Sequence, residues 1–319
     1  MKRNIVTVLM LASLLTALIP MILRGYSATW TGFGDFESPD GDFIRGKTLW
    51  DWLELFIIPI FLAIAAFYLN RSEREAESQR ADQRARLEHE IAADRQREAA
   101  LQSYLDRMAD SLLKENLRLS ENEKVRNVAR IRTLTVLQGL DEKRKGIVLL
   151  FLHESALITE EPIISLTGAD LTRTFLTVAN LMGAVLRGAD LTEAILMGTN
   201  LTKANLIQAD LQRADLTGAV LREASLMEAQ LEGAKLLEAD LREAKLMIAN
   251  MTKADLRKAK LIGADLRGAF LEAANLEGAY LEAADLTGAR LQRAKVSDEQ
   301  LATVKSLEGA ILPDGTEHD

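Results

Sequence analysis

A leucine recurs at every fifth residue through most of the second half of this 319-residue chain. Of the 26 positions from Leu166 to Leu291, 25 are leucine and one is Met251. The residue three positions after each is alanine, except at Thr174 and Thr199. Five helical residues turn through about 500°, so these leucines would visit every side of a helix. In a continuous strand, an odd period would send successive leucines to opposite faces. The pattern therefore predicts a repeat of short extended stretches and corners, with every leucine pointing inward.

The five-residue units resemble the consensus of the pentapeptide repeat family. Examples are Ala-Asp-Leu-Thr-Gly at 214–218 and 284–288, and Ala-Asn-Leu-Glu-Gly at 274–278. This resemblance implies an all-β fold, a right-handed quadrilateral β-helix with four pentapeptides in each coil. Leucine and alanine would fill its narrow interior, and the Asp or Asn between them would point outward. From Gly183 to Gly288, nine glycines fall two residues after a leucine, where a corner favours a permissive backbone. Twenty residues per coil give about 6.5 coils and a rod about 31 Å long.

The chain divides into five predicted segments. These are a membrane hairpin over 1–70, a charged long helix over 71–120, a helical N-terminal cap over 121–162, the β-helix over 163–296, and a C-terminal cap helix and tail over 297–319. Gly139 interrupts the first cap and Asp141 begins a second helix, while Ser297 opens a capping box. Helices are expected at both ends because an open β-helix end exposes unpaired backbone groups.

Two apolar segments predict transmembrane helices, over about 5–23 and 53–69, joined by a loop over 24–52. Basic residues precede the first segment and follow the second, which predicts that both termini are cytoplasmic. The expected location is a bacterial inner membrane or a thylakoid-type membrane. A cleaved signal peptide ending near Tyr26-Ser27-Ala28 is the alternative for the first segment. The role of the aromatic loop stays open.

Residues 71–119 contain neither proline nor glycine and predict one long helix. Apolar residues such as Leu87, Ile91 and Leu101 follow three- and four-residue steps, but Asp94 and Glu98 interrupt the stripe. Two interpretations are open: a coiled coil that makes a homo-oligomer through 71–120, or a solvated, salt-bridged spacer.

No motif in the sequence points to chemistry. There is no cysteine, and the three histidines lie in three separate segments. No phosphate-binding loop and no nucleophile with a base at motif spacing is found. The acidic residues of the 24–52 loop lack the spacing of an EF-hand. We therefore expect no enzymatic activity, no catalytic residues, no metal site and no cofactor.

Three functions fit this organisation. The favoured one is a membrane-tethered protein–protein interaction scaffold that presents a cytoplasmic β-helix to an unknown partner. The family resemblance also suggests imitation of DNA to occupy a topoisomerase. Residues 166–295 hold 17 acidic and 16 basic side chains, and this near-neutral balance disfavours mimicry of a polyanion. The third is a sensor or transport accessory protein. No nucleic-acid partner is expected.

The twenty-residue coil predicts one outward column with an apolar middle. Residues twenty apart lie one above another, so Arg187 and Arg267 flank the intervening positions. The predicted partner-binding residues are Ile207, Met227, Met247 and Ile248. Methionine is frequent at adaptable binding surfaces, and contiguous exposed apolar area marks contacts. Chance placement of four apolar side chains is the alternative.

Overall fold

The computed structural model describes residues 36–37, 40–44, 49–119, 122–159 and 162–319. For residues 36, 44 and 49–58 it describes the backbone only. The chain forms two units, which meet between His89 and Glu90. Each unit is treated by itself below.

The first unit contains a short β-hairpin and most of a long helix. Strands β1 (Phe36–Glu37) and β2 (Phe43–Ile44) pair antiparallel, with Glu37 opposite Phe43. Gly41 takes a φ of 86° in the turn between them, a conformation that glycine adopts without strain. The aromatic loop predicted over 24–52 therefore contains local strand pairing.

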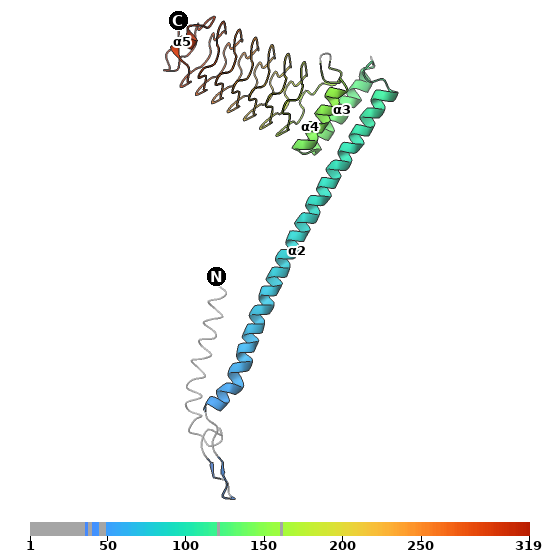
Figure 1. Ribbon diagram of the computed structural model, residues 1–319, viewed down its shortest axis with the longest axis vertical. Coiled ribbons are helices and arrows are strands. Elements are labelled where there is room, and N and C mark those ends of the chain that lie inside the picture. The colour runs from blue at the N-terminus through green and yellow to red at the C-terminus, as the bar shows by residue number, and fades with distance from the viewer. Residues whose placement is uncertain (1–35, 38–39, 45–48, 120–121, 160–161) are drawn as a thin grey trace. The chain divides into compact units, whose positions relative to one another are not determined.

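Helix α2 (Leu49–Lys114) runs through 66 residues (Figure 1). Its first part covers the second apolar segment, so the predicted second span and the charged helix are one continuous element that contains Pro59. The helix ends at Lys114, five residues before the predicted end. Helix ends often fray by one or two residues, and here Leu117 N bonds instead to Ser111 O at 3.1 Å in a turn.

Among the residues it describes, the structure contains no helix that is both long and apolar enough to span a bilayer. The first predicted span, 5–23, and the signal-peptide alternative lie outside the described residues. The second, 53–69, lies in α2, where side chains are described only from Pro59 onward. The prediction of two transmembrane helices is therefore not supported by the structure.

The second unit begins with a helical cap made of the end of α2, α3 (Glu123–Gly139) and α4 (Glu142–Glu154). The side chain of Asp141 caps α4, as predicted, by accepting a bond from Arg144 N. Tyr104 of α2 hydrogen-bonds Thr133 of α3 at 2.9 Å, and its ring packs edge-on against Phe151 of α4. Burial raises the pKa of Tyr104 to about 12. One tyrosine thus ties three helices together.

Part of the apolar stripe of α2 packs in the core of this cap. Leu101 and Met108 are buried, and Leu105 and Leu112 pack against the same core. These residues form the C-terminal half of the stripe that suggested a coiled coil. Their burial against α3 and α4 leaves Leu87 and Ile91 as its exposed members.

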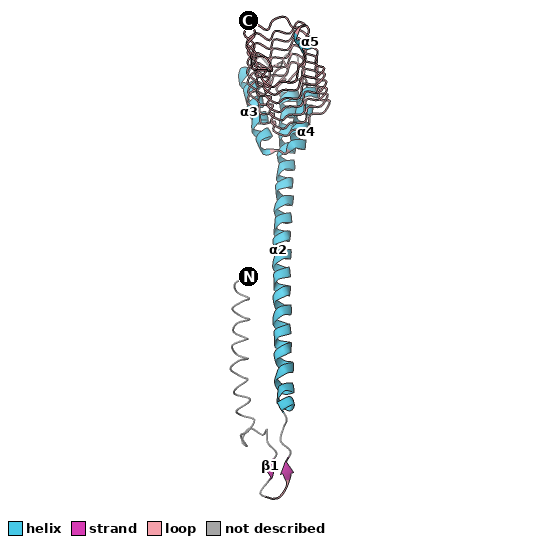
Figure 2. Ribbon diagram, turned by 90° about the vertical axis from the view of Figure 1, so that its left-hand side faces the viewer, coloured by secondary structure: helices cyan, strands magenta, loops and turns pink. Residues whose placement is uncertain are grey.

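The repeat forms the predicted coil, and α3 and α4 lie at one end of it (Figure 2). Each residue between two inward positions pairs in parallel with the residue twenty positions later, from Asp170 with Asp190 to Asn275 with Lys295. Leu206 N donates to Ser225 O at 2.7 Å, for example. Nearly all interior leucines and alanines are fully buried, and Met251 fills a leucine place with no exposure. The five-residue period therefore corresponds to one side of a four-sided coil.

The corners differ from the expectation that they need glycine. All 26 corner residues between 168 and 293 have φ between 55° and 71°, but only ten are glycine. The other 16 are mainly Glu, Lys and Arg, each of which bears a left-handed penalty of about 1 kcal/mol. Among described residues with positive φ, only Val178 and Ile248 are β-branched. Those two corners are the most strained for their residue type.

The C-terminal end is closed by α5 (Asp298–Leu301) and the tail. Ser297 and Gln300 form the predicted capping box. The Gln300 amide also donates to Leu276 O at 2.8 Å and to Ala279 O at 2.7 Å, so it takes up the Ala279 carbonyl to which a further coil would otherwise donate. After α5 the pairing offset is 21 residues, as between Asp285 and Ser306. One inserted residue therefore accommodates the cap helix.

Candidate interaction surfaces

The predicted column exists on one side of the β-helix, which we call the methionine face and define as the coil sides 184–188, 204–208, 224–228, 244–248 and 264–268. Gln208 N donates to Met227 O at 2.9 Å, and Glu228 N donates to Met247 O at 3.0 Å. These bonds stack Ile207, Met227 and Met247 on three successive coils, where all three are half-buried. Ile248 is 50% exposed at the adjoining corner. The structure thus brings the four predicted residues onto one face.

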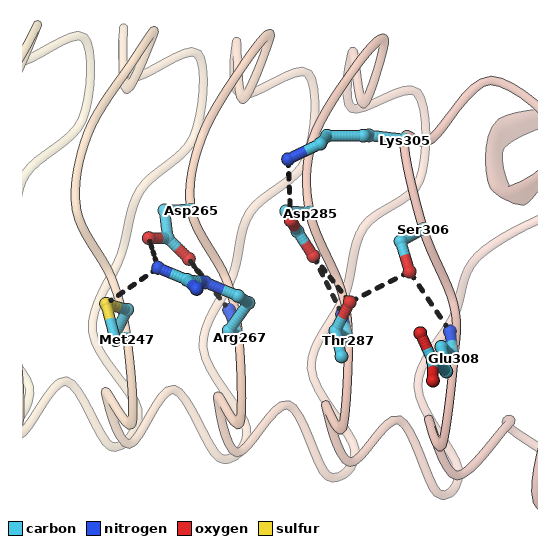
Figure 3. Close-up of polar contacts among 8 residues, drawn as sticks. All are labelled: Met247, Asp265, Arg267, Asp285, Thr287, Lys305, Ser306 and Glu308. Carbon is cyan, nitrogen blue, oxygen red and sulfur yellow. Dashed lines mark hydrogen bonds and ion pairs between the residues drawn. The ribbon is translucent and has the colours of Figure 1, made fainter.

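Polar contacts close both ends of this column. Arg267 forms a two-pronged pair with Asp265, at 2.8 and 2.7 Å, and its guanidinium also lies 3.3 Å from the sulfur of Met247 (Figure 3). The hydrogen bonds from Arg267 hold the pKa of Asp265 below its usual value. At the other end Arg187 donates to Gln208 at 3.3 Å. The contact between Arg267 and the sulfur of Met247 therefore marks the end of the apolar column.

Each aspartate of the coils accepts a hydrogen bond from the backbone N–H two residues later. Asp285, for example, accepts bonds from Thr287 N and Thr287 Oγ1, and it also pairs with Lys305 at 3.0 Å (Figure 3). Partial burial opposes ionisation of Asp285, but these partners lower the pKa of its carboxyl. Among the described residues, no group of three His, Asp or Glu side chains is placed to hold a metal. The regular carboxylates are turn-forming groups in this arrangement.

Charge is unevenly distributed around the coils. Between residues 184 and 268 the methionine face carries five charged side chains, Arg187, Glu228, Lys245, Asp265 and Arg267. The side that follows it in the chain carries seven over the matching coils, 189–193 through 269–273. The middle of the methionine face is thus the least charged part of this pair of sides.

A second exposed apolar surface lies where the cap meets the first coils, and the sequence did not reveal it. We call it the cap collar and define it as Ile147, Leu150, Phe175 and Val178. Their exposed fractions are 46%, 60%, 47% and 76%. The first two lie on α4 and the others on the first coil, so no periodicity links them. The fold brings Ile147 and Phe175 to the lining of one cleft, and Leu150 and Val178 lie three residues further along α4 and the coil.

Close backbone contact holds these two parts of the collar in place. A side chain at Gly146 would lie 2.7 Å from the carbonyl oxygen of Phe175, so α4 can approach the coil only because glycine is there. Beside it, Lys145 is almost wholly buried and pairs with Asp170 at 2.7 Å. Partial burial opposes ionisation of Asp170, but hydrogen bonds from Lys145 and Thr172 lower its pKa. The cap is therefore fixed to the first coil by single, specific contacts.

The coil, its alanine and leucine interior and its helical ends define a solenoid repeat protein. Comparison with known proteins identifies the kind of solenoid. The family model named pentapeptide repeats matches this chain over residues 164–198, 199–236, 224–261 and 259–298, with eight copies of the repeat. The chain therefore belongs to the pentapeptide repeat family.

Two cyanobacterial structures are among the similar proteins. HetL of Nostoc sp. strain PCC 7120, described as involved in heterocyst differentiation regulation, is 36% identical over 48% of this chain and 87% of its own, with a TM-score of 0.27. Rfr23 of Cyanothece 51142 is 37% identical over 34% of this chain and 64% of its own, with a TM-score of 0.14.

Trypsin-treated QnrB1, a plasmid-mediated fluoroquinolone resistance protein, is 23% identical over 47% of this chain and 78% of its own, with a TM-score of 0.31. None of the curated proteins matches this chain.

Proposed function

We propose that this protein is an interaction scaffold whose β-helix binds a protein partner through the methionine face. The observation that carries the proposal is Ile248. A β-branched residue in the left-handed region costs more than the glycine found at ten other corners, and half of this side chain is exposed to water. Nothing in the interior requires it there. Backbone strain of this kind concentrates at functional positions.

The neighbours of Ile248 support the same assignment. Ile207, Met227 and Met247 extend its apolar surface across three coils, a length of about 10 Å from first to last. Methionine adapts its shape to different partners, and arginine is enriched at binding interfaces. Arg187 and Arg267 at the two ends provide polar contacts at the rim. An apolar centre with a polar rim is the usual arrangement of a protein interface.

A double substitution tests this proposal. Met227→Glu with Met247→Glu changes two outward side chains, so the coil should remain folded, which circular dichroism and thermal melting would check. Crosslinking in intact cells should then recover at least tenfold less of the partner that the unaltered chain recovers, because burying two carboxylates against an apolar partner is unfavourable. Leu237→Glu changes the equivalent outward position on another side and serves as the matched control. Unchanged recovery from the folded double variant would exclude the methionine face.

We further propose that the N-terminal region tethers this scaffold to a membrane, with both termini cytoplasmic. The support is the apolar surface of α2: Ile60, Phe61, Leu62, Phe67 and Leu69 are each 55–70% exposed. Apolar side chains on all sides of a helix need a nonpolar environment. Arg71, Arg74 and Arg80 follow at once and suit a cytoplasmic membrane surface.

Protease protection tests the tether and its orientation. In sealed right-side-out vesicles, added protease should spare everything beyond Arg71 and cut at most in the loop over 24–52. Vesicles opened by detergent are the control, and there the exposed parts of α2 should be cut. Recovery of the full-length chain in the soluble fraction without detergent would contradict the tether, and digestion of the β-helix in sealed vesicles would contradict the orientation.

A further inference from the structure

A cleft of about 450 Å³ opens where α2, α4 and the first coil meet within the second unit. We call it the cap cleft. Its walls include Asp94 and Glu98 of α2, Glu142, Arg144 and Ile147 of α4, and Phe175 of the first coil. The cap collar shares Ile147 and Phe175 with this cleft. The cleft therefore joins a charged wall to an apolar margin.

The charge that this cleft presents to a ligand is negative. Arg144 pairs with Asp94 at 2.8 Å, with Glu98 at 3.0 Å and with Asp141, and its side chain is only 16% exposed. The acidic partners lie nearer the surface, since the Asp94 and Glu98 side chains are 59% and 50% exposed. The hydrogen bonds from Gln102 and then from Arg144 lower the pKa of Glu98, so this carboxylate stays ionised. The lining holds four carboxylates, at Asp94, Glu98, Asp141 and Glu142, against two cations, the exposed Lys143 and the largely covered Arg144, so its net charge is −2.

The collar beside the cleft contains the second strained apolar corner. Val178 has a φ of 58° and is 76% exposed. Its side chain lies beside the next corner, where a Cβ built on Gly198 would be 3.7 Å from Val178 Cγ2. A β-branched side chain that is strained and faces water contributes little to folding. Val178 lies three residues after Phe175 in the chain, and its exposed side chain adds apolar surface to the collar.

The outer face of α3 has the opposite character. Val128 and Ile131 are 46% and 59% exposed, and Lys124 and Arg132 are exposed beside them. Positions 124, 128 and 131 follow four- and three-residue steps, so they share one side of the helix. The whole helix carries four basic residues and one acidic residue, a net charge of +3. The apolar side chains of α3 match the apolar collar, and its basic side chains match the carboxylates of the cap cleft.

We propose that the outer face of α3 from one copy of this protein docks in the cap cleft and collar of a second copy. Val128 and Ile131 cover Phe175 and Val178, and Lys124 or Arg132 reaches the carboxylates of the cleft. Helix α3 has 17 residues and so is about 25 Å long and about 10 Å wide. It covers roughly 250 Å² of its partner, well under the roughly 800 Å² per side of a stable interface. The association is therefore weak and depends on concentration.

Sedimentation of the full-length chain in mild detergent tests this contact over a protein concentration of about 1 to 100 μM, the range in which a weak interface of this size is populated. The unaltered chain should associate, and the association should weaken as salt is raised because screening reduces the attraction between α3 and the cleft. Ile131→Glu and Val178→Glu should each reduce association at least tenfold. Ile262→Glu, at an exposed apolar position away from both surfaces, should leave it unchanged.

Mixing the two variants isolates the contact. The Ile131→Glu chain keeps an intact cleft, and the Val178→Glu chain keeps an intact α3 face. The mixture should therefore form a heterodimer at concentrations where each variant alone stays monomeric. A chain that is monomeric at every concentration would overturn the proposal, as would a mixture that does not associate. Association abolished by Leu87→Glu or by the methionine-face substitutions, and not by Ile131→Glu, would assign the contact elsewhere and equally overturn it.

Discussion

The coils and the helical cap are stabilised in opposite ways. In the coils, the same bonds recur every twenty residues, and Leu206 N to Ser225 O has equivalents along the whole rod. In the cap, each contact occurs once, as with Tyr104 to Thr133 or Lys145 to Asp170. A repeated interaction tolerates the loss of one copy, whereas a unique one has no substitute. The coils should therefore be sensitive to changes of register and the cap to changes of single side chains.

The largest effect is expected from a deletion that shifts the register of the coils. Removal of two residues near Ala209 turns every later leucine away from the interior, so cooperative melting of the rod should be lost. Removal of residues 209–228, one full coil, should leave a shorter rod that melts cooperatively. Circular dichroism and calorimetry would measure both. Similar melting of the two deletion variants would show that the twenty-residue coil does not govern stability.

A smaller effect is expected from Lys145→Met in the cap. The substitution leaves Asp170 without its ion-pair partner, and loss of one member of a buried pair costs about 3–5 kcal/mol. Because the Asp170 side chain is 34% exposed, water offsets part of this, and we expect a loss of about 2 kcal/mol in the free energy of unfolding. Lys305→Met in the coils removes an exposed pair and should cost less than about 1 kcal/mol. Denaturant titration of both variants would measure the difference.

The smallest effect concerns acid. The pKa values of Asp170, Asp215, Asp265 and Asp285 are lowered in the folded chain. A group whose folded pKa lies below its unfolded value stabilises the fold above the unfolded pKa, which is about 3.9 for Asp. That stabilisation is lost as the pH falls through the lower folded value. Melting temperature should thus be level near neutral pH and should fall below about pH 4.

The Asp170→Asn variant distinguishes the contribution of the cap from that of the coils to the pH dependence of the melting temperature. It should remove one part of the acid dependence and leave the contributions of Asp215, Asp265 and Asp285. Melting curves between neutral and acid pH for both chains would measure it. An identical dependence in the variant would mean that Asp170 contributes nothing to acid sensitivity, despite its pairing with Lys145.

The sequence predicts the coils well because a single period specifies them. Leu and Ala positions alone define inside and outside, and Ser297 and Asp141 identify helix starts through local bonds. The cap is less predictable. The stripe containing Leu101 and Met108 has the spacing of a coiled coil, and a sequence pattern does not distinguish packing within one chain from packing between two chains.

The candidate surfaces divide in the same way. Ile207, Met227 and Met247 could be grouped from the sequence because a twenty-residue interval places them on one side of the rod. The collar could not, since Ile147 and Phe175 belong to different elements and line one cleft only in the fold. Corner residues were also misjudged, because the continuous backbone pairing holds even valine and isoleucine in the left-handed region.

The constant interval between paired residues also determines how the rod grows as it folds. Each coil bonds to the coil that lies twenty residues earlier, so each added coil closes a loop of the same length. The entropic cost of loop closure is therefore the same for every coil, whatever the total number of coils. Contacts this close in sequence are typical of fast folding. The cap is synthesised first and offers a finished edge to the first coil. The rod can therefore fold during translation, with one coil added at a time from the cap onward.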